Sequence, residues 1–227
     1  LTPDEAYYVQ NAWLEKMLPD DVLFGFKAGA TSETARAQFN LQEPVAGLLL
    51  ESGRLFPNDS LRAARLLKPM LEIELAFKFN DYTQGPIPDV DSLKKCIDTV
   101  FVVVEIPDLG FESLRPFNAA DLIAANVGAA YYVVPESGMQ ADSLDWKSST
   151  LRLTQNGSTL LKGKGADAYG DPWKAVLWLA NHYISRDYVI GKGQHLFTGA
   201  IGGMKPAEAG HYEAYLNDQK VFEFHIQ

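Results

Sequence analysis

The chain has 227 residues and a mass of 25.1 kDa, which fits one large domain or two small ones. Hydrophobic residues make up 47% of it and aromatic residues 11%, which excludes an intrinsically disordered protein. The net charge is −9 and no segment is rich in lysine or arginine, which argues against binding to nucleic acid or to an anionic membrane surface. The single cysteine, Cys96, excludes an intramolecular disulfide and a zinc site made of cysteines.

The N-terminal half of the sequence predicts short strands and helices in turn. Thr2-Pro3-Asp4-Glu5 indicates a helix start, with Thr2 as the cap and Glu5 completing a capping box. Alternating or continuous apolar patterns predict strands, whereas capping residues followed by a helical period predict helices. Strands are expected at 22–29, 48–50, 71–79 and 100–106, and short helices at 33–39 and 91–98.

The C-terminal half predicts two further helices and several strands. Asn118 is expected to cap a helix that continues to Tyr132, and Asp171-Pro172 is expected to start another that reaches Ile184. Asn156-Gly157 is a strong hairpin signal between two apolar segments. Strands are expected at 151–155, 158–162, 195–198, 211–216 and 220–226.

Strands outnumber the predicted helices and do not alternate strictly with them. This order favours an α+β fold with a mixed or antiparallel sheet, rolled or barrel-like and flanked by helices. No linker and no internal repeat is visible, so we predict one domain that spans residues 1–227.

Three acidic residues suggest a metal site. Glu72 and Glu74 alternate with apolar residues in a predicted strand, so both project from one face, about 7 Å apart at roughly 3.3 Å per residue. Glu105 closes the apolar run 100–104, where a carboxylate needs a cation or donors to compensate its burial. If the three meet, they form an all-oxygen site for Mg²⁺ or Mn²⁺. The alternative is an ordinary solvated strand face with a surface acid.

Other candidate residues leave two readings open. Lys27, within an apolar segment that contains glycines, either reaches solvent or points into a pocket, where it binds a carboxylate or donates a proton with a lowered pKa. Thr198 and Gly199 form either a turn or the rim of a substrate site. Gly163-Lys164-Gly165 lacks the context of a dinucleotide site. The histidines are scattered and are interpreted as structural or surface residues: His182, His195, His211 and His225.

Taken in order, these segments resemble the 2-keto-4-pentenoate hydratase family of the fumarylacetoacetate hydrolase-like superfamily. The resemblance covers nearly the whole chain. Its helical motifs are Ala6-Tyr7-Tyr8-Val9-Gln10, Ala125-Asn126 and the segment from Gly170-Asp171-Pro172 to Trp178-Leu179-Ala180-Asn181. Its strand and turn motifs are Gly25 to Ser32, Glu43-Pro44 to Gly47, Pro69 to Phe77, Glu105-Ile106-Pro107-Asp108 and Thr198-Gly199-Ala200.

The resemblance implies a fold, a site and a reaction. The fold is that of the fumarylacetoacetate hydrolase C-terminal domain, without the N-terminal helix that the family usually carries. Glu72, Glu74 and Glu105 are implied to hold Mg²⁺ or Mn²⁺, which would bind the carboxylate and 2-oxygen of a 2-keto acid. Lys27 is implied as the catalytic residue, which with Thr198 and Gly199 also binds substrate. The implied lyase reaction adds water to 2-hydroxypenta-2,4-dienoate, a step of aromatic-compound catabolism.

Four departures from the family pattern bear on that reaction. Val45 stands where the hydratases commonly carry Asp, and Ala46 replaces an aromatic residue. Leu109-Gly110 replaces Ser-Arg, and Met70 stands where Arg is usual. An acid–base carboxylate and two arginines are therefore absent from the sequence. A 2-keto acid decarboxylase, a C–C hydrolase or a non-catalytic ligand-binding relative remain alternatives to a hydratase.

The expected surroundings of the protein follow from the same reading. We expect a cytoplasmic homo-oligomer that acts on a small 2-keto acid and binds neither nucleic acid nor membrane. The sequence begins with Leu1 rather than methionine, so a cleaved leader is also considered.

Overall fold

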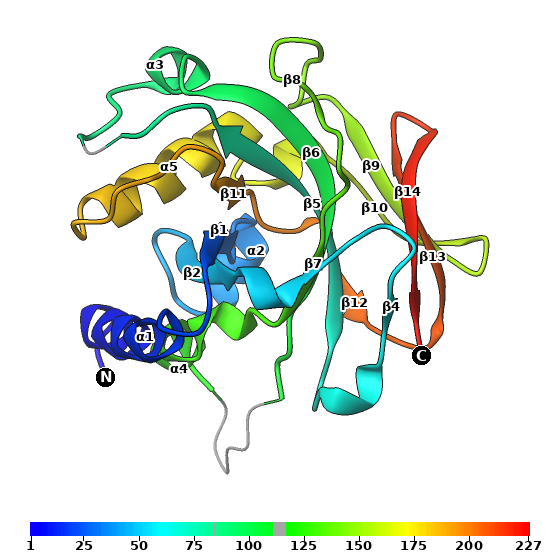
Figure 1. Cartoon of the computed structure of the whole chain (residues 1–227), viewed down its shortest axis with the longest axis horizontal. Coiled ribbons are helices and arrows are strands. Elements are labelled where there is room, and N and C mark those ends of the chain that lie inside the picture. Colours follow the sequence, from blue (N-terminus) through cyan, green and yellow to red (C-terminus); the bar gives the residue numbers. More distant parts are fainter. Residues whose placement is uncertain (84, 111–116) are drawn as a thin grey trace.

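Two β-sheets form the framework of the computed structural model, which describes residues 1–83, 85–110 and 117–227. The larger sheet curls around one of its own faces, with β5 and β6 forming a long arc (Figure 1). Its strands, in spatial order, are β2 (Val45–Leu50), β1 (Leu23–Gly29), β11 (His195–Phe197), β5 (Met70–Phe79), β6 (Ile97–Ile106), β7 (Tyr131–Val133) and β3 (Arg54–Leu55), with β12 (Ile201–Pro206) beside β5 and β8 (Met139–Gln140) beside β6. The smaller sheet has the order β10 (Ser158–Lys164), β9 (Thr150–Gln155), β13 (Gly210–Leu216), β14 (Gln219–Ile226) and β4 (Ser60–Leu61).

In Figure 1, α1 and α5 lie at the left, and the smaller sheet lies at the right, beyond the arc of β5 and β6. The α-helices are α1 (Pro3–Met17), α2 (Glu33–Gln38), α3 (Val90–Lys94), α4 (Ala119–Ala124) and α5 (Pro172–Ile184). The 3₁₀ turns are η1 (Glu51–Gly53), η2 (Ala63–Arg65), η3 (Asn126–Gly128) and η4 (Gly165–Asp167). Within the described residues, no helix is long and apolar enough to cross a membrane.

The predicted α+β class and mixed sheet are confirmed. β1 and β11 run parallel, whereas β5 pairs antiparallel with both β6 and β11. The capping box at Thr2 and Glu5 is present, as is the hairpin between β9 and β10 with Asn156 and Gly157 at positive φ. One hydrophobic core joins residues of both sheets. The single-domain assignment for residues 1–227 stays a prediction.

The predicted helix from Asn118 to Tyr132 is wrong in its second half. α4 ends at Ala124, and the chain then turns through Asn126 and Val127, whose φ values are 54° and 53°. The Asn126 side chain bonds both the N–H and the C=O of Leu48, at 2.7 and 2.9 Å. These bonds hold a left-handed backbone conformation that ends the helix and lets the chain enter β7. The predicted helix at 91–98 is also too long at its end, since α3 ends at Lys94 and β6 starts at Ile97.

Strand register decides which side chains lie inside the curl. Residues directly opposite each other on antiparallel strands share a face. Glu72 faces Glu105, and Lys78 faces His195. A second core cluster shares this inner face and comes from six strands or their ends: Phe24, Leu49, Ala76, Phe101, Val103, Tyr132, Val134 and Phe197. The inside of the curl therefore has carboxylates toward one end, apolar side chains in the middle and Lys78 with His195 toward the other end.

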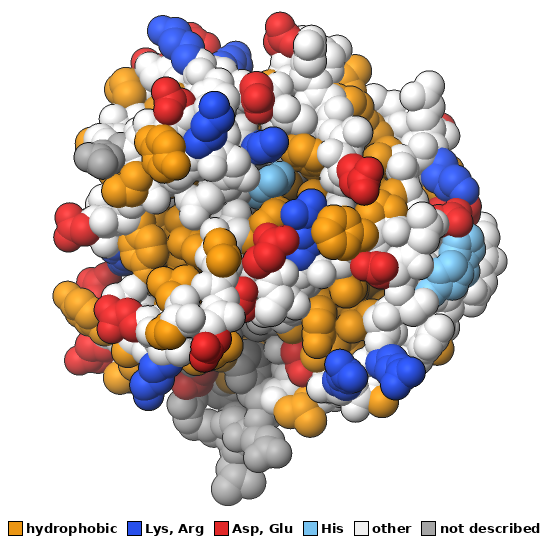
Figure 2. All heavy atoms as spheres, in the orientation of Figure 1, with side chains coloured by type: hydrophobic (Ala, Val, Ile, Leu, Met, Phe, Trp, Pro, Cys, Tyr) orange, Lys and Arg blue, Asp and Glu red, His pale blue; other side chains and the backbone are white. Residues whose placement is uncertain are grey.

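Figure 2 shows the face of the molecule seen in Figure 1. Histidine and Lys/Arg side chains border a hollow near its middle, over the position of β11 in Figure 1.

β2, at one edge of the curled sheet, is bonded on its outward side by side chains. The Ala46 N–H donates to the Tyr7 hydroxyl at 2.9 Å, and the Ala46 C=O accepts from Gln10 Nε2 at 2.8 Å. The Asn126 side chain accepts the N–H of Leu48 and donates to its C=O. The motif Ala-Tyr-x-x-Gln on α1 therefore positions β2, which runs antiparallel to β1 and pairs its Gly47 with Lys27.

Candidate metal centre

Strand pairing brings the three predicted acids together at one end of the curl. Glu72 and Glu74 project from β5 toward the inner face, and Glu105 projects from β6 directly opposite Glu72. One ligand oxygen from each carboxylate lies within 4.8 Å of those of the other two. Glu74 and Glu105 are fully buried, whereas Glu72 is partly exposed. The interpretation of these acids as a solvated strand face is therefore wrong for Glu74 and Glu105.

Two of these carboxylate oxygens lack a hydrogen-bond partner. Glu74 Oε2 accepts the backbone N–H of Gly199 at 2.8 Å, but Glu74 Oε1 and Glu105 Oε2 have no partner among the described residues. A buried carboxylate oxygen without a donor costs free energy. A divalent cation with oxygen ligands would compensate both, so the residues present fit a hard metal ion.

Lys27 lies beside this group and is only 2% exposed. Its Nζ donates to Glu105 Oε1 and, at 3.1 Å, to the carbonyl oxygen of Val127. The alternative in which Lys27 reaches solvent is therefore wrong. Lys27 and Glu105 are separated by 78 residues in sequence, so only the folded chain shows this ion pair.

The charges of the site are strongly coupled. Burial raises the pKa of Glu74 well above its ordinary value, and the neighbouring charges of Glu105 and Glu72 raise it further. Burial also raises the pKa of Glu105 to about 7, against the opposing effect of Lys27. Burial disfavours the charged form of Lys27, but the three carboxylates outweigh it and raise its pKa. The direction of this shift is opposite to the lowered pKa considered for Lys27 from the sequence.

A cleft of about 720 Å³ opens at Glu72. Its walls come from the loop after β1, from α2, from the turn around Tyr169 and from the segment 200–204. Glu74, Glu105 and Lys27 are almost completely buried, so a ligand in the cleft meets Glu72 first.

Thr198 and Gly199 lie beside the candidate metal centre, and both form hydrogen bonds within the chain. The Thr198 hydroxyl accepts the N–H of Leu75 and donates to the carbonyl of Gly199, both at 3.2 Å. Gly199 has φ of 85°, and a Cβ there would lie 2.5 Å from Thr31 Oγ1, so only glycine fits. These residues orient Glu74 in this structure, and their contact with substrate stays a prediction.

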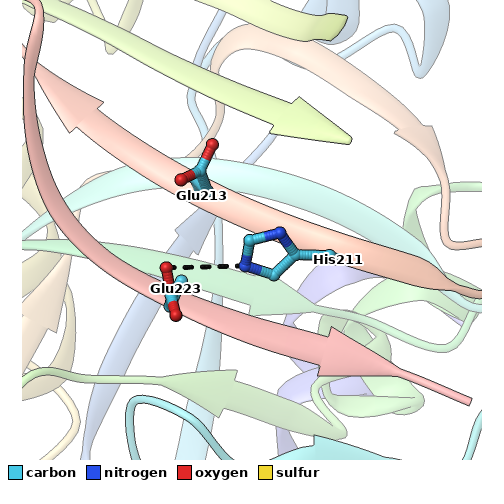
Figure 3. Close-up of side chains that lie close together, drawn as sticks. All are labelled: His211, Glu213 and Glu223. Atoms are coloured by element: carbon cyan, nitrogen blue, oxygen red, sulfur yellow. Dashed lines mark ion pairs between the residues drawn. The ribbon is translucent and has the colours of Figure 1, made fainter. Parts of the chain in front are cut away.

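A second cluster of potential ligands lies on the smaller sheet. Figure 3 shows His211 and Glu213 on β13 with Glu223 on β14, and His211 Nε2 lies 3.5 Å from Glu223 Oε2. Lys220 pairs with Glu213 at 3.2 Å and with Glu223 at 2.7 Å. Lys220 therefore compensates both carboxylates, whereas Glu74 Oε1 and Glu105 Oε2 have no partner among the described residues. This difference favours the inner group as the candidate metal centre.

Two features of the site and its cleft are not marked by any sequence pattern. Arg36 on α2 lines it, and its guanidinium carbon lies 4.9 Å from the centre of the Tyr169 ring. Arg36 is one of several arginines in polar segments and is not marked by any motif. The Val127 carbonyl that holds Lys27 depends on the turn after α4, which the helical pattern of the sequence conceals.

Comparisons with known proteins find similar sequences over most of the chain. No family model matches the chain. The 2-oxo-hept-4-ene-1,7-dioate hydratase of Escherichia coli is 27% identical over 216 residues, which cover 92% of this chain and 81% of the relative. The 2-keto-4-pentenoate hydratase of Burkholderia vietnamiensis (strain G4 / LMG 22486) is 28% identical over 218 residues, covering 93% and 81%. The 4-oxalocrotonate decarboxylase of Pseudomonas sp. (strain CF600) is 25% identical over 211 residues, covering 92% and 80%.

Solved structures share the fold. The 4-oxalocrotonate decarboxylase from Pseudomonas putida G7, complexed with magnesium and adipate, superposes with a TM-score of 0.93 at 22% identity, over 100% of this chain and 87% of that one. A protein assigned to the fumarylacetoacetate hydrolase family from Yersinia pestis CO92 has a TM-score of 0.65 at 17% identity, over 92% and 94%. The resemblance that the ordered motifs predict is thereby confirmed: the chain is similar to 2-keto-4-pentenoate hydratases and has a fumarylacetoacetate hydrolase-like fold.

Proposed function

We propose that this protein is a metal-dependent lyase that acts on a small 2-keto acid or its enol, as the 2-keto-4-pentenoate hydratases do. One observation carries the proposal: Glu72, Glu74 and Glu105 converge within 4.8 Å at the end of a cleft, beside the buried Lys27. The hydratase names of the relatives support the reaction class. Mg²⁺ or Mn²⁺ is proposed because the three side chains offer only oxygen ligands.

In the proposed mechanism, separate residues bind the ion, attract the substrate and position a ligand. Glu72, Glu74 and Glu105 would hold the ion, which when bound would supply a Lewis acid for negative charge developing at the 2-oxygen of the substrate. Lys27 keeps a fixed positive charge beside Glu105, where it attracts the carboxylate of an incoming 2-keto acid. Gly199 orients Glu74 through its N–H, and Thr198 fixes the turn that presents this N–H.

The hydratase reaction needs two proton movements. In 2-hydroxypenta-2,4-dienoate, ketonisation moves a proton from the 2-hydroxyl to the far end of the diene. Water then adds across the remaining conjugated double bond and gives 4-hydroxy-2-oxopentanoate. A positioned general acid–base typically contributes about 10²–10⁴-fold to such steps. Of the three proposed ligands, Glu72 is the partly exposed one and lines the cleft, so the substrate is proposed to approach the ion from its side.

Val45 favours a second candidate, a 2-keto acid decarboxylase. This residue is 1% exposed, and its Cγ2 would lie 3.2 Å from a Cβ placed on Gly29, so it closes an apolar flank of the strand that carries Lys27. Val45 has no titratable group with which to move a proton during hydration. Decarboxylation releases CO₂, leaves the electron pair of the broken bond in the conjugated enolate, and consumes no water. One of the similar proteins is named a decarboxylase, which supports decarboxylation as the alternative reaction.

One experiment separates these functions. Purified protein is incubated with 2-hydroxypenta-2,4-dienoate or with 2-oxohex-3-enedioate, with and without Mg²⁺, and both ultraviolet absorbance and released CO₂ are followed. Metal-dependent loss of the dienoate without CO₂ supports the hydratase, and CO₂ from the dioate supports the decarboxylase. Binding of either compound without turnover, measured by calorimetry, would identify a non-catalytic relative and overturn the proposal. The homo-oligomeric state and the cytoplasmic location remain proposals too.

A further inference from the structure

We propose that the end of the curled sheet opposite the metal centre binds a small anion that carries a carboxylate or phosphate group. A cavity of about 430 Å³ lies there, a volume typical of small-molecule sites. Its lining includes Arg54, Lys78, Lys192 and His195, together with the aromatic rings of Phe24 and Phe101. The histidine and basic side chains around a hollow in Figure 2 lie on this face.

This basic pocket is separate from the metal centre. Glu74 and Lys78 project from the same face of β5 but lie four residues apart, roughly 13 Å at about 3.3 Å per residue. Between them lie the apolar side chains of Ala76 and, opposite it, Phe101 and Phe197. A ligand in the basic pocket therefore does not touch Glu74 or Glu105.

The charges that face the pocket leave an excess of positive charge. Arg54, Lys78 and Lys192 oppose two carboxylates, Glu51 and Glu136. Glu51 pairs with Arg54 at 3.3 Å and is 46% exposed. In the described parts of the chain, neither Lys78 nor Lys192 forms an ion pair, and both are free to bind an anion.

Two buried nitrogen atoms at this pocket have no hydrogen-bond partner among the described residues. His195 is 6% exposed and stacks on Phe24 with ring centroids 4.5 Å apart, yet its Nδ1 makes no hydrogen bond to any described residue. Arg54 Nε is also buried and unpartnered among the residues described. The Arg54 guanidinium carbon lies 5.2 Å from the centre of the Phe24 ring, which fixes its direction. Buried polar atoms are usually satisfied, so the presence of both in the lining of one cavity with two unpaired lysines points to an absent partner.

Anion binding is tested by nuclear magnetic resonance on the full chain with labelled histidine rings, assigned with His195→Gln. Inorganic phosphate, acetate and benzoate are titrated separately. We expect a saturable shift of the His195 ring signal with at least one of them, and the responding anion identifies the group recognised. Lys78→Met and Arg54→Met should each weaken binding by about tenfold or more, because each removes a charge-assisted contact.

A matched control variant tests whether the loss of binding is specific to cations of the pocket. Lys162→Met removes an equally long, exposed cation from β10, outside the pocket, and should leave the binding constant unchanged. Absence of a saturable His195 shift up to about 50 mM of every anion, or equal binding by Lys78→Met and the wild type, would overturn the proposal. Because the readout is the His195 ring rather than turnover, its outcome is independent of the proposed lyase activity.

Discussion

Acidification should destabilise the protein through its buried histidines, and His195 gives the clearest case. Burial, followed by the charges of Lys78 and Arg54, lowers the pKa of His195 from 6.5 to about 3. The ring is therefore neutral in the folded protein at neutral and mildly acidic pH. In the unfolded chain it regains an ordinary pKa near 6.5. Between pH 6.5 and pH 3 the unfolded state thus binds more protons, and stability falls as the pH falls.

The magnitude follows from these two pKa values. Preferential protonation of the unfolded state costs about 0.2 kcal/mol at pH 7 and about 2 kcal/mol at pH 5, at 1.36 kcal/mol per pKa unit. The wild type should therefore lose about 2 kcal/mol more unfolding free energy between pH 7 and pH 5 than His195→Gln does.

The measurement is urea denaturation followed by tryptophan fluorescence at pH 7 and pH 5, on metal-free wild type and His195→Gln. Glu74 and Glu105 act in the opposite direction, because a raised pKa in the folded state stabilises it as the pH falls. Both carboxylates are present in both proteins, so their effect cancels in the difference. Equal losses in the two proteins, within about 0.5 kcal/mol, would refute the reasoning.

Three further outcomes test the metal centre and its cleft. Glu74→Gln should bind Mg²⁺ or Mn²⁺ at least about tenfold more weakly, because it removes one of three charged ligands; equal metal content of variant and wild type after purification without chelator would contradict the assignment. Lys27→Met, folded in the presence of Mg²⁺, should lose affinity for the 2-keto acid mimic oxalate, and unchanged affinity by calorimetry would leave Lys27 a purely structural role. The wild type should hydrate 2-hydroxypenta-2,4-dienoate about 10²–10⁴-fold more slowly than an Asp-bearing hydratase, with part of the rate recovered by Val45→Asp. Comparable wild-type rates, measured side by side, would show that Asp is dispensable at this position.

Local pattern was sufficient for the elements that hold the metal centre. The alternation around Glu72 and Glu74 determines their common face because a strand has a period of two, and the position of Glu105 follows from the apolar run before it. Asn156-Gly157 likewise determines its own hairpin, since both residues accept positive φ. That Glu105 meets Glu72 and Glu74 is implied only by the family resemblance, because sequence spacing does not determine the register that pairs Glu72 with Glu105.

Features that depend on contacts between residues far apart in the sequence could not be predicted from local patterns. Asn126 breaks the predicted helix only because Leu48, 78 residues away, offers it a backbone N–H and C=O. No local pattern marks β12, which contains Gly202 and Gly203 at positive φ, yet the strand pairs with β5 across a register shift. The basic pocket joins Lys78 to His195 through the register of β5 with β11, and no local pattern connects them.

The side chains that bond β2 have a consequence for how the protein assembles. A sheet edge with unpaired backbone groups is a template on which another chain can add a strand. At Ala46 and Leu48 that template is already occupied by a phenol and two amides, from Tyr7, Gln10 and Asn126. This edge is thereby protected against strand exchange and fibril growth. Copies of this chain are expected to associate through other surfaces than this edge.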